Sequence, residues 1–236
     1  MIKTASYTEI GGRSCNEDSV GIRVEDKGIL AIVADGLGGH GGGDIASRLT
    51  VDIVSEGWSG KVDADELCAN IQKAHEEIRK LQSPACKMKS TITALCYSHG
   101  KCVWAHCGDS RIYRFKNDKL EFQTLDHSAS QLAVYLGQIT PAEIRFHEDR
   151  SRILRALGQD DELKIDTGSL DLVKGEKYAF LLCSDGFWEY VLEDEMELDL
   201  KNSATPGEWV RRMRKRLLER VPKDNDNNTA AAVWVY

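Results

Sequence analysis

Five short acidic segments carry the residues of this chain that are best suited to chemistry. Asp35 and Asp185 each follow an apolar run, and a carboxylate at the end of a buried strand is costly unless something pairs with it. One Asp-Gly or Asp-Ser pair alone is typical of a solvated turn. Five such segments together favour a shared cation site. They are Asn16-Glu17-Asp18, Ala34-Asp35-Gly36, Gly108-Asp109-Ser110-Arg111, Ser184-Asp185-Gly186 and Asp226-Asn227-Asn228-Thr229.

All of these candidate ligands offer oxygen atoms. Mg²⁺, Mn²⁺ and Ca²⁺ take carboxylate, carbonyl and water oxygens. Zinc is expected to use His or Cys, and no His/Cys cluster adjoins the five segments in the sequence. A carboxylate cluster large enough for two hard cations suggests the two-metal device, which activates water and clamps the oxygens of a displacement at phosphorus.

A glycine-rich loop supports a second hypothesis for the same region. Residues Gly36-Leu37-Gly38-Gly39-His40-Gly41 match G-x-G-x-x-G between a predicted strand and a predicted helix, as in a nucleotide-dependent oxidoreductase. Two features weigh against it. Asp35 would face the pyrophosphate, and another helix follows the first where a parallel strand is required. A glycine-rich turn that binds no ligand is the remaining alternative.

The elements that must position these residues follow from the hydrophobic pattern. Apolar residues at helical spacing predict helices over 44–58, 63–81 and 206–220, and short helices and loops are expected over 128–158. The runs between 90 and 125 are joined by short turns, as in an antiparallel meander. Strands alongside separate helices favour antiparallel sheets with helices packed outside, not a doubly wound parallel sheet. The predicted strands are 2–10, 18–25, 28–35, 90–99, 100–109, 111–118, 119–125, 164–172, 177–186 and 229–236.

Length, charge and cysteine use exclude several classes of protein. The 236 residues suit one domain over 1–236, and the net charge of −7 disfavours a general nucleic-acid binder. No apolar stretch reaches the roughly 18 residues of a membrane span. The N-terminus has no signal-peptide core, so we expect a cytoplasmic protein with no membrane contact. The seven cysteines are odd in number and never spaced C-x-x-C, which favours reduced thiols.

Seven segments, in this order, closely resemble the metal-dependent protein phosphatase family (PPM, protein phosphatase 2C) in its compact bacterial form. They are R-x-x-NED, ADGLGGH, GDSR, DHS, RALG, SDGFW and DNNT, and the match spans residues 5–235. The resemblance implies an α+β fold, a four-layer α-β-β-α sandwich with two antiparallel β-sheets flanked by helices. The metals would lie in a cleft at one edge. The insertion at about 128–158 resembles the flap beside the active site in bacterial members.

The resemblance also implies metal ligands. Asp35 resembles the carboxylate that bridges two ions, and the Gly36 carbonyl resembles a ligand of one of them. Asp185 and Asp226 resemble the other ligands of the first ion. Glu17 and Asp18 resemble the acids that bind the ions through water. Asp109 resembles the residue that, together with Asp185, holds a third, weaker ion.

Two residues are candidates for contact with the substrate or for proton transfer. Arg13 resembles the arginine that grips the substrate phosphate, and guanidinium geometry suits two phosphate oxygens. Some relatives carry Asp-Gly-His with the His as proposed general acid, but Leu37 occupies that position here. His40 lies three residues further on, and the sequence leaves open whether it reaches the site or braces the loop. His127 is expected to order the loop that enters the insertion.

Together these features predict a Mn²⁺- or Mg²⁺-dependent protein-serine/threonine phosphatase, with two core ions and a third. The resemblance implies that a metal-bridging hydroxide attacks phosphoserine and phosphothreonine in proteins. We therefore expect a phosphorylated protein as substrate, a Ser/Thr kinase as the indirect partner, a role in signalling, and a monomer. The alternative is a phosphatase-like module that only binds phosphoproteins, although a complete ligand set argues against it.

Overall fold

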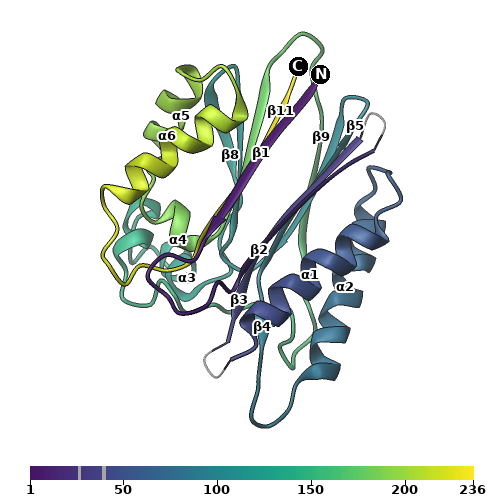
Figure 1. Ribbon diagram of the computed structural model, residues 1–236, viewed down its shortest axis with the longest axis vertical. Helices are drawn as coiled ribbons and strands as arrows, with labels where there is room; N and C mark the ends of the chain where they lie inside the picture. The colour runs from purple at the N-terminus through teal and green to yellow at the C-terminus, as the bar shows by residue number, and fades with distance from the viewer. Residues whose placement is uncertain (26–27, 39–40) are drawn as a thin grey trace.

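The strands of the described chain form two antiparallel sheets that face each other in this computed structural model (Figure 1). The structure describes residues 1–25, 28–38 and 41–236. One sheet has the order β1 (Ile2–Glu9), β11 (Asn228–Val235), β10 (Tyr178–Cys183), β7 (Arg111–Lys116) and β8 (Lys119–Gln123). The other has the order β2 (Asp18–Glu25), β3 (Gly28–Leu37), β5 (Ile92–Ser98), β6 (Lys101–Cys107) and β9 (Asp166–Asp171), with β4 (Lys89–Ser90) beside β3.

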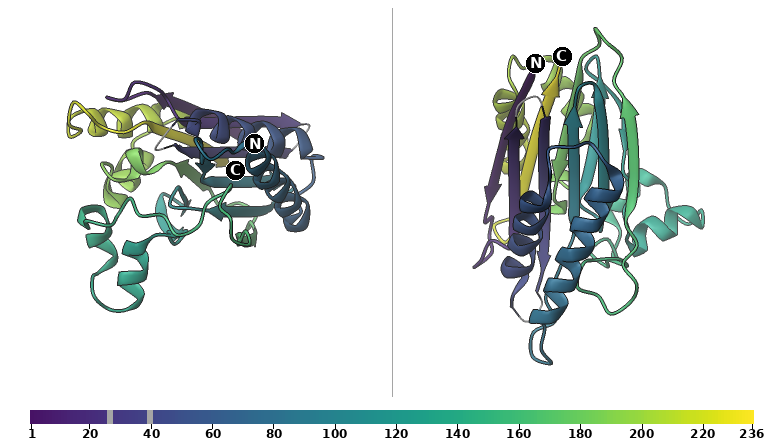
Figure 2. Two further views of the ribbon diagram at one scale, coloured as in Figure 1. Left: turned by 90° about the horizontal axis from the view of Figure 1, so that it is seen from below. Right: turned by 90° about the vertical axis from the view of Figure 1, so that its right-hand side faces the viewer.

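Helices cover the outer face of each sheet (Figure 1). The β3 side carries α1 (Gly43–Gly57) and α2 (Ala64–Leu81), and the β10 side carries α4 (Asp185–Trp188), α5 (Glu193–Lys201) and α6 (Pro206–Leu218). The insertion holds α3 (Ala129–Tyr135) and a 3₁₀ helix (Pro141–Phe146), and it extends beyond the sheets (Figure 2). Among the residues described here, no helix has both the length and the apolar character needed to cross a bilayer.

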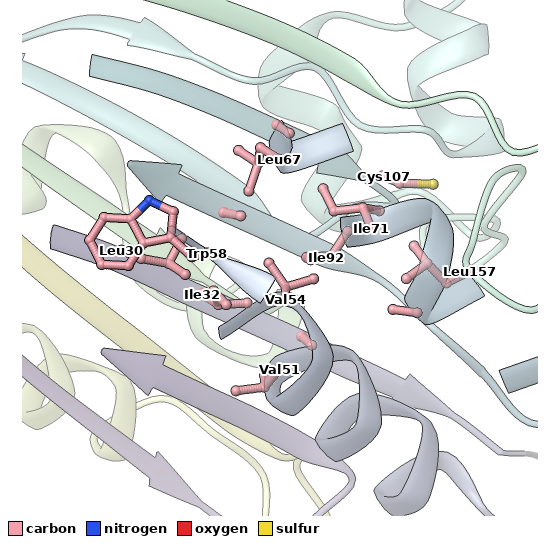
Figure 3. Close-up of a cluster of buried hydrophobic side chains, with 14 of the residues drawn as sticks. Leu30, Ile32, Val51, Val54, Trp58, Leu67, Ile71, Ile92, Cys107 and Leu157 are labelled. Carbon is pink, nitrogen blue, oxygen red and sulfur yellow. The ribbon is translucent and has the colours of Figure 1, made fainter. Parts of the chain in front are cut away.

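The continuous apolar run of β3 is explained by burial on both faces. Successive strand residues point to opposite faces, so Leu30 and Ile32 pack under the helices while Ile29 and Val33 face the other sheet. Figure 3 shows the helix-side cluster, in which residues of α1 and α2 close over β3. Full burial of each such aliphatic side chain contributes about 1.5–3 kcal/mol.

The second sheet is buried in the same way on its helix side. Trp209 and Met213, one turn apart on α6, pack against Phe115 of β7. The three apolar layers together make the predicted four-layer α-β-β-α sandwich, and the predicted α+β fold is confirmed. Since the sheets are antiparallel, the Rossmann-type alternative is excluded.

The prediction of one meander over 90–125 is wrong. β5 and β6 pair in one sheet, but the chain turns at Gly108 and crosses to the other sheet, where β7 and β8 pair. Trp104 of β6 and Ile112 of β7 meet in the core between the sheets, so the crossing buries both.

Helix α5 was not among the predicted helices. Its sequence is strongly acidic, and only Met196 and Leu200, four residues apart, mark the buried face. The acidic residues around them hid this short apolar pattern.

Candidate metal and phosphate site

Asp18 and Asp35 lie directly opposite each other at the ends of β2 and β3. The backbone of Asp35 is held by Thr91: its N–H donates to Thr91 Oγ1 at 3.0 Å, and its carbonyl accepts from the Thr91 N–H at 2.8 Å. Strand pairing therefore brings two acidic segments together. Because backbone groups hold Asp35 in place, its carboxylate is not needed to fix this position.

Asp18 is fixed by a group from the facing sheet. Ser184 Oγ donates to Asp18 Oδ2 at 2.7 Å and accepts from the Thr229 N–H at 3.0 Å. Ser184 follows β10, and Thr229 lies in β11. The clamp therefore joins the NED, SDG and DNNT segments at one end of the sandwich.

Asp185 and Asp226 come together because the residues that follow them, Gly186 and Asn227, pack closely against each other. A Cβ on Gly186 would lie 2.1 Å from the carbonyl oxygen of Asn227, so only glycine permits this approach. The Asp185 carboxylate accepts from the Gly186 N–H at 2.6 Å, and Asp226 Oδ1 accepts from the Asn227 N–H at 2.8 Å. Each carboxylate keeps lone pairs for another partner.

Mutual repulsion within the cluster is strong. Burial, and then the charges of Asp18 and Asp185, raise the pKa of Asp35 well above its ordinary value. Burial and Asp226 raise the pKa of Asp185 to about 7, while burial raises the pKa of Asp18 to about 6 against the lowering effect of Ser184. A divalent cation stabilises the ionised form of such a group, so these acids fit a cation.

Asp109 lies behind the same cluster at the β6–β7 turn. It is 1% exposed, and neither carboxylate oxygen has a hydrogen-bond partner among the described residues. Its carbonyl accepts from Trp188 Nε1 at 2.9 Å, which fixes the backbone alone. Burial and then Asp185 raise the pKa of Asp109 well above its ordinary value. A buried carboxylate without a partner calls for an ion or a proton.

Glu17 and Gly36 meet the start of α1. The Gly36 N–H donates to the Glu17 carbonyl at 3.0 Å, and a Cβ on Gly36 would lie 2.1 Å from the Gly43 carbonyl oxygen. The Glu17 carboxylate accepts from the Gly43 N–H, although burial and then Asp44 raise its pKa overall. Glycine at position 36 is thus required by the close approach of three chain segments.

A cleft of about 870 Å³ opens onto these residues. Arg13 lies on its wall, about half exposed, and Arg13 Nη2 donates to Asp226 Oδ2 at 2.9 Å. The predicted site residues that line the cleft are Arg13, Glu17, Asp35, Gly36, Asp185 and Asp226. The buried Asp18 and Asp109 are not among the lining residues, and His40 lies outside the described residues.

Asn227 organises the loop before β2, a role that the sequence analysis did not predict. Its Oδ1 accepts from the Glu17 N–H at 2.8 Å, and its Nδ2 donates to the carbonyls of Ile10 and Cys15 at 2.7 and 3.0 Å. The Asn227 amide therefore holds the loop that carries Arg13 at three points, in addition to the hydrogen bond from the Gly12 N–H to the Asn225 carbonyl at 2.9 Å. The place of Asn227 inside the DNNT motif was the only available signal.

His127 orders more than the entrance of the insertion. It binds both backbone groups of Gly108: Nδ1 accepts from the Gly108 N–H at 3.1 Å, and the His127 N–H donates to the Gly108 carbonyl at 2.9 Å. Its own carbonyl accepts from the Leu154 N–H at 2.7 Å. His127 therefore ties the end of the insertion to the turn that presents Asp109.

His106, His127 and Asp166 also place possible ligand atoms within 4.8 Å of one another. The hydrogen bond from Gly108 leaves the proton of His127 on Nε2, which lies 3.2 Å from Asp166 Oδ2. Arg155 Nη1 also lies 3.1 Å from Asp166 Oδ1. Because the Nε2 lone pair is not free and a guanidinium occupies the carboxylate, we interpret this group as a hydrogen-bond network.

Comparisons with known proteins relate this chain to one protein family. The family model described as protein phosphatase 2C matches residues 7–226. The serine/threonine phosphatase stp of Listeria innocua is 33% identical over 207 residues, which cover 83% of this chain and 81% of that protein.

Two solved structures resemble the chain over nearly all of its length. The Mycobacterium tuberculosis serine/threonine phosphatase PstP/Ppp is 29% identical with a TM-score of 0.85, and the alignment covers 98% of this chain and 97% of that one. The catalytic domain of PstP in complex with 2 manganese ions is 28% identical with a TM-score of 0.83, and the alignment covers 100% and 99%. The chain therefore belongs to the protein phosphatase 2C family and is a metal-dependent serine/threonine protein phosphatase.

Proposed function

We propose that this phosphatase uses Mn²⁺ or Mg²⁺ at the Asp35 cluster to hydrolyse phosphoserine and phosphothreonine in proteins, and so reverses the action of a Ser/Thr kinase. The observation that carries the proposal is the gathering of Asp18, Asp35 and Asp185, which have raised pKa values, in an all-oxygen donor set. Asp18 is buried, whereas Asp35 and Asp185 are half-buried and line the cleft. Such a cluster suits hard divalent ions.

In this proposal Asp35 would be the carboxylate shared by two ions. Asp185, Asp226 and the Gly36 carbonyl would be further ligands, and Glu17 and Asp18 would act through water. When bound, the ions would supply a water of lowered pKa and polarise the phosphoryl oxygens. Asp109, together with Asp185, would hold a third ion, which accounts for its unpartnered buried oxygens.

Arg13 is proposed to bind the substrate phosphate. Its guanidinium lies on the cleft wall beside Asp226, where one Nη donates to that carboxylate. No other described residue accepts a hydrogen bond from the Arg13 side chain, so its remaining N–H groups can donate to two phosphate oxygens, which would orient the phosphoryl group toward the carboxylate cluster. The Asn227 amide keeps Arg13 in place by holding the loop on both sides of it.

The leaving serine or threonine alkoxide needs a proton, and two positions bear on its source. Leu37 lines the cleft and has no acidic proton. His40 is the candidate general acid, and a kinetic experiment tests whether it supplies this proton. A His40→Asn variant should shift the alkaline limb of the kcat profile if His40 supplies that proton, and should leave the profile in place if it does not.

The experiment compares Asp35→Asn with the matched control Asp171→Asn. Asp171 is exposed at the end of β9. Phosphate release from a phosphothreonine peptide and Mn²⁺ binding by calorimetry are measured for both. Asp35→Asn should lose turnover by at least about a thousandfold, equivalent to about 4 kcal/mol, together with its tight Mn²⁺ binding. Wild-type Mn²⁺ affinity in Asp35→Asn would overturn the bridging role.

A further inference from the structure

The charged residues of the cleft wall fall into two groups. The acidic lining residues are Glu17, Asp35, Asp185 and Asp226, and each belongs to the proposed metal site. Among the described residues, every other charged residue that lines the cleft is basic: Arg13, Lys87 and Lys89. We call Lys87 and Lys89 the lysine pair.

Local structure explains why the lysine pair faces the cleft. Met88 lies between the two lysines and is 3% exposed, because it packs into the core beneath α1 and α2. In an extended segment the residues on either side of a buried one point the opposite way. Lys89 of β4 lies opposite Leu37 of β3. Leu37 follows Asp35 by two residues, so Lys89 lies near the proposed metal site.

The lysine pair forms no ion pair with another described residue of the chain. Lys80, Lys116 and Lys119 each have an acidic partner within 4.0 Å. No acid of the described chain lies within that distance of either Lys87 or Lys89, and neither ammonium group donates a hydrogen bond to a described residue. Two ammonium groups are therefore available to a ligand in the cleft.

The effect of these lysines on a ligand depends on the net charge of the cleft when the metal site is loaded. Divalent ions would offset the carboxylates of the metal site, and the lysine pair and Arg13 would then dominate the field in the cleft. Arg13 is proposed for the phosphate itself. The lysine pair lies on the part of the cleft wall formed by β4 and the residues just before it, where it would attract carboxylates of a bound phosphorylated segment and repel basic ones.

We propose, resting on the proposed function, that Lys87 and Lys89 make this enzyme select phosphorylated segments with Asp or Glu beside the phosphoresidue. The lysine pair determines specificity and takes no part in bond breaking. Exposed ion pairs contribute about 0.2–1 kcal/mol each, so two contacts should give about a 2- to 30-fold preference in kcat/KM. The preference should shrink as salt is raised, because exposed charges are screened.

The test uses three phosphothreonine peptides of equal length, flanked by Glu, Gln or Lys. Wild-type enzyme with Mn²⁺ should rank them Glu, Gln, Lys in kcat/KM. The Lys87→Ala/Lys89→Ala variant should bring the Glu-to-Gln ratio close to one, and Lys87→Glu/Lys89→Glu should reverse the ranking of the Glu and Lys peptides. The control is Lys174→Ala/Lys177→Ala, two exposed lysines in the β9–β10 connection, which should keep the wild-type ratio.

Two results would overturn the proposal: a wild-type ratio near one, or a preference that persists in Lys87→Glu/Lys89→Glu. Thermal melting of each variant confirms that the ratio is measured on folded protein. Failure of the proposed function looks different, because wild-type enzyme would then leave all three peptides intact.

Discussion

Replacing Asp109 with asparagine should stabilise the metal-free protein at neutral pH while weakening it as an enzyme. Asp109 is 1% exposed, its two carboxylate oxygens have no partner among the described residues, and Asp185 repels its charge. Asparagine keeps the size of the side chain and removes the ionisation. The Asp109 carboxylate therefore destabilises the metal-free protein, and the same carboxylate is the one that we propose as a ligand of a third ion.

The magnitude follows from linkage. The unfolded chain ionises Asp109 near pH 3.8, whereas burial and Asp185 raise the pKa in the folded chain well above that value. Between these two pKa values the native state binds more protons than the unfolded state, so the free energy of unfolding falls by about 1.4 kcal/mol per pH unit. The asparagine side chain of the variant does not ionise, so it contributes no such pH dependence. As the pH rises from 5 to 8, the stability difference should therefore move in favour of Asp109→Asn, by at most about 4 kcal/mol.

The assay is thermal unfolding in excess chelator at several pH values. For a chain of this length about 1 kcal/mol corresponds to a Tm shift of about 2–4 °C, so the difference in Tm should move in favour of the variant by at most about 8–16 °C between pH 5 and pH 8. Saturating Mn²⁺ should raise the Tm of wild type more than that of the variant. A difference in Tm that is independent of pH, or that moves in favour of wild type, would refute the reasoning.

Three further predictions concern the residues around the cluster. Arg13→Ala should lower kcat/KM on a phosphothreonine peptide by about 10- to 150-fold, with Arg13→Lys intermediate and Mn²⁺ affinity retained; an unchanged kcat/KM would leave Arg13 as a solvated charge. His127→Ala should lower the free energy of unfolding by about 1–3 kcal/mol, and His127→Asn by less, because an amide oxygen can still accept from the Gly108 N–H; equal losses in urea denaturation would contradict that role. Asn227→Ala should cost about 2–4 kcal/mol by the same measurement, because it removes three hydrogen bonds from the loop that carries Arg13, and a loss below about 1 kcal/mol would show that the loop is held by other contacts.

The sequence was most informative where a local pattern decides the structure. Asp35 and Asp185 follow apolar runs, so their positions near the ends of the buried strands β3 and β10 could be predicted. The continuous apolar run of β3 and the helical spacing in α2 likewise predicted the layers. The assignment of particular ligands to particular ions stays a prediction.

Features created by contacts between distant segments could not be predicted. The clamp of Ser184 on Asp18 joins residues 166 positions apart, and neither side chain signals the other. The crossing after β6 was missed because a short glycine turn suits both a hairpin and a change of sheet. The lysine pair escaped notice because its importance lies in its place on the cleft wall without an acidic neighbour among the described residues, which only the folded chain reveals.

The central claim, that the carboxylate cluster works by holding divalent cations, is tested most directly by chelation. Phosphate release from a phosphothreonine peptide is followed in the purified enzyme, then after excess chelator, and then after Mn²⁺ or Mg²⁺ is restored. We expect turnover to fall by at least about a hundredfold on chelation and to return with either ion, since an oxygen-only site suits both. Full turnover in excess chelator would contradict the account.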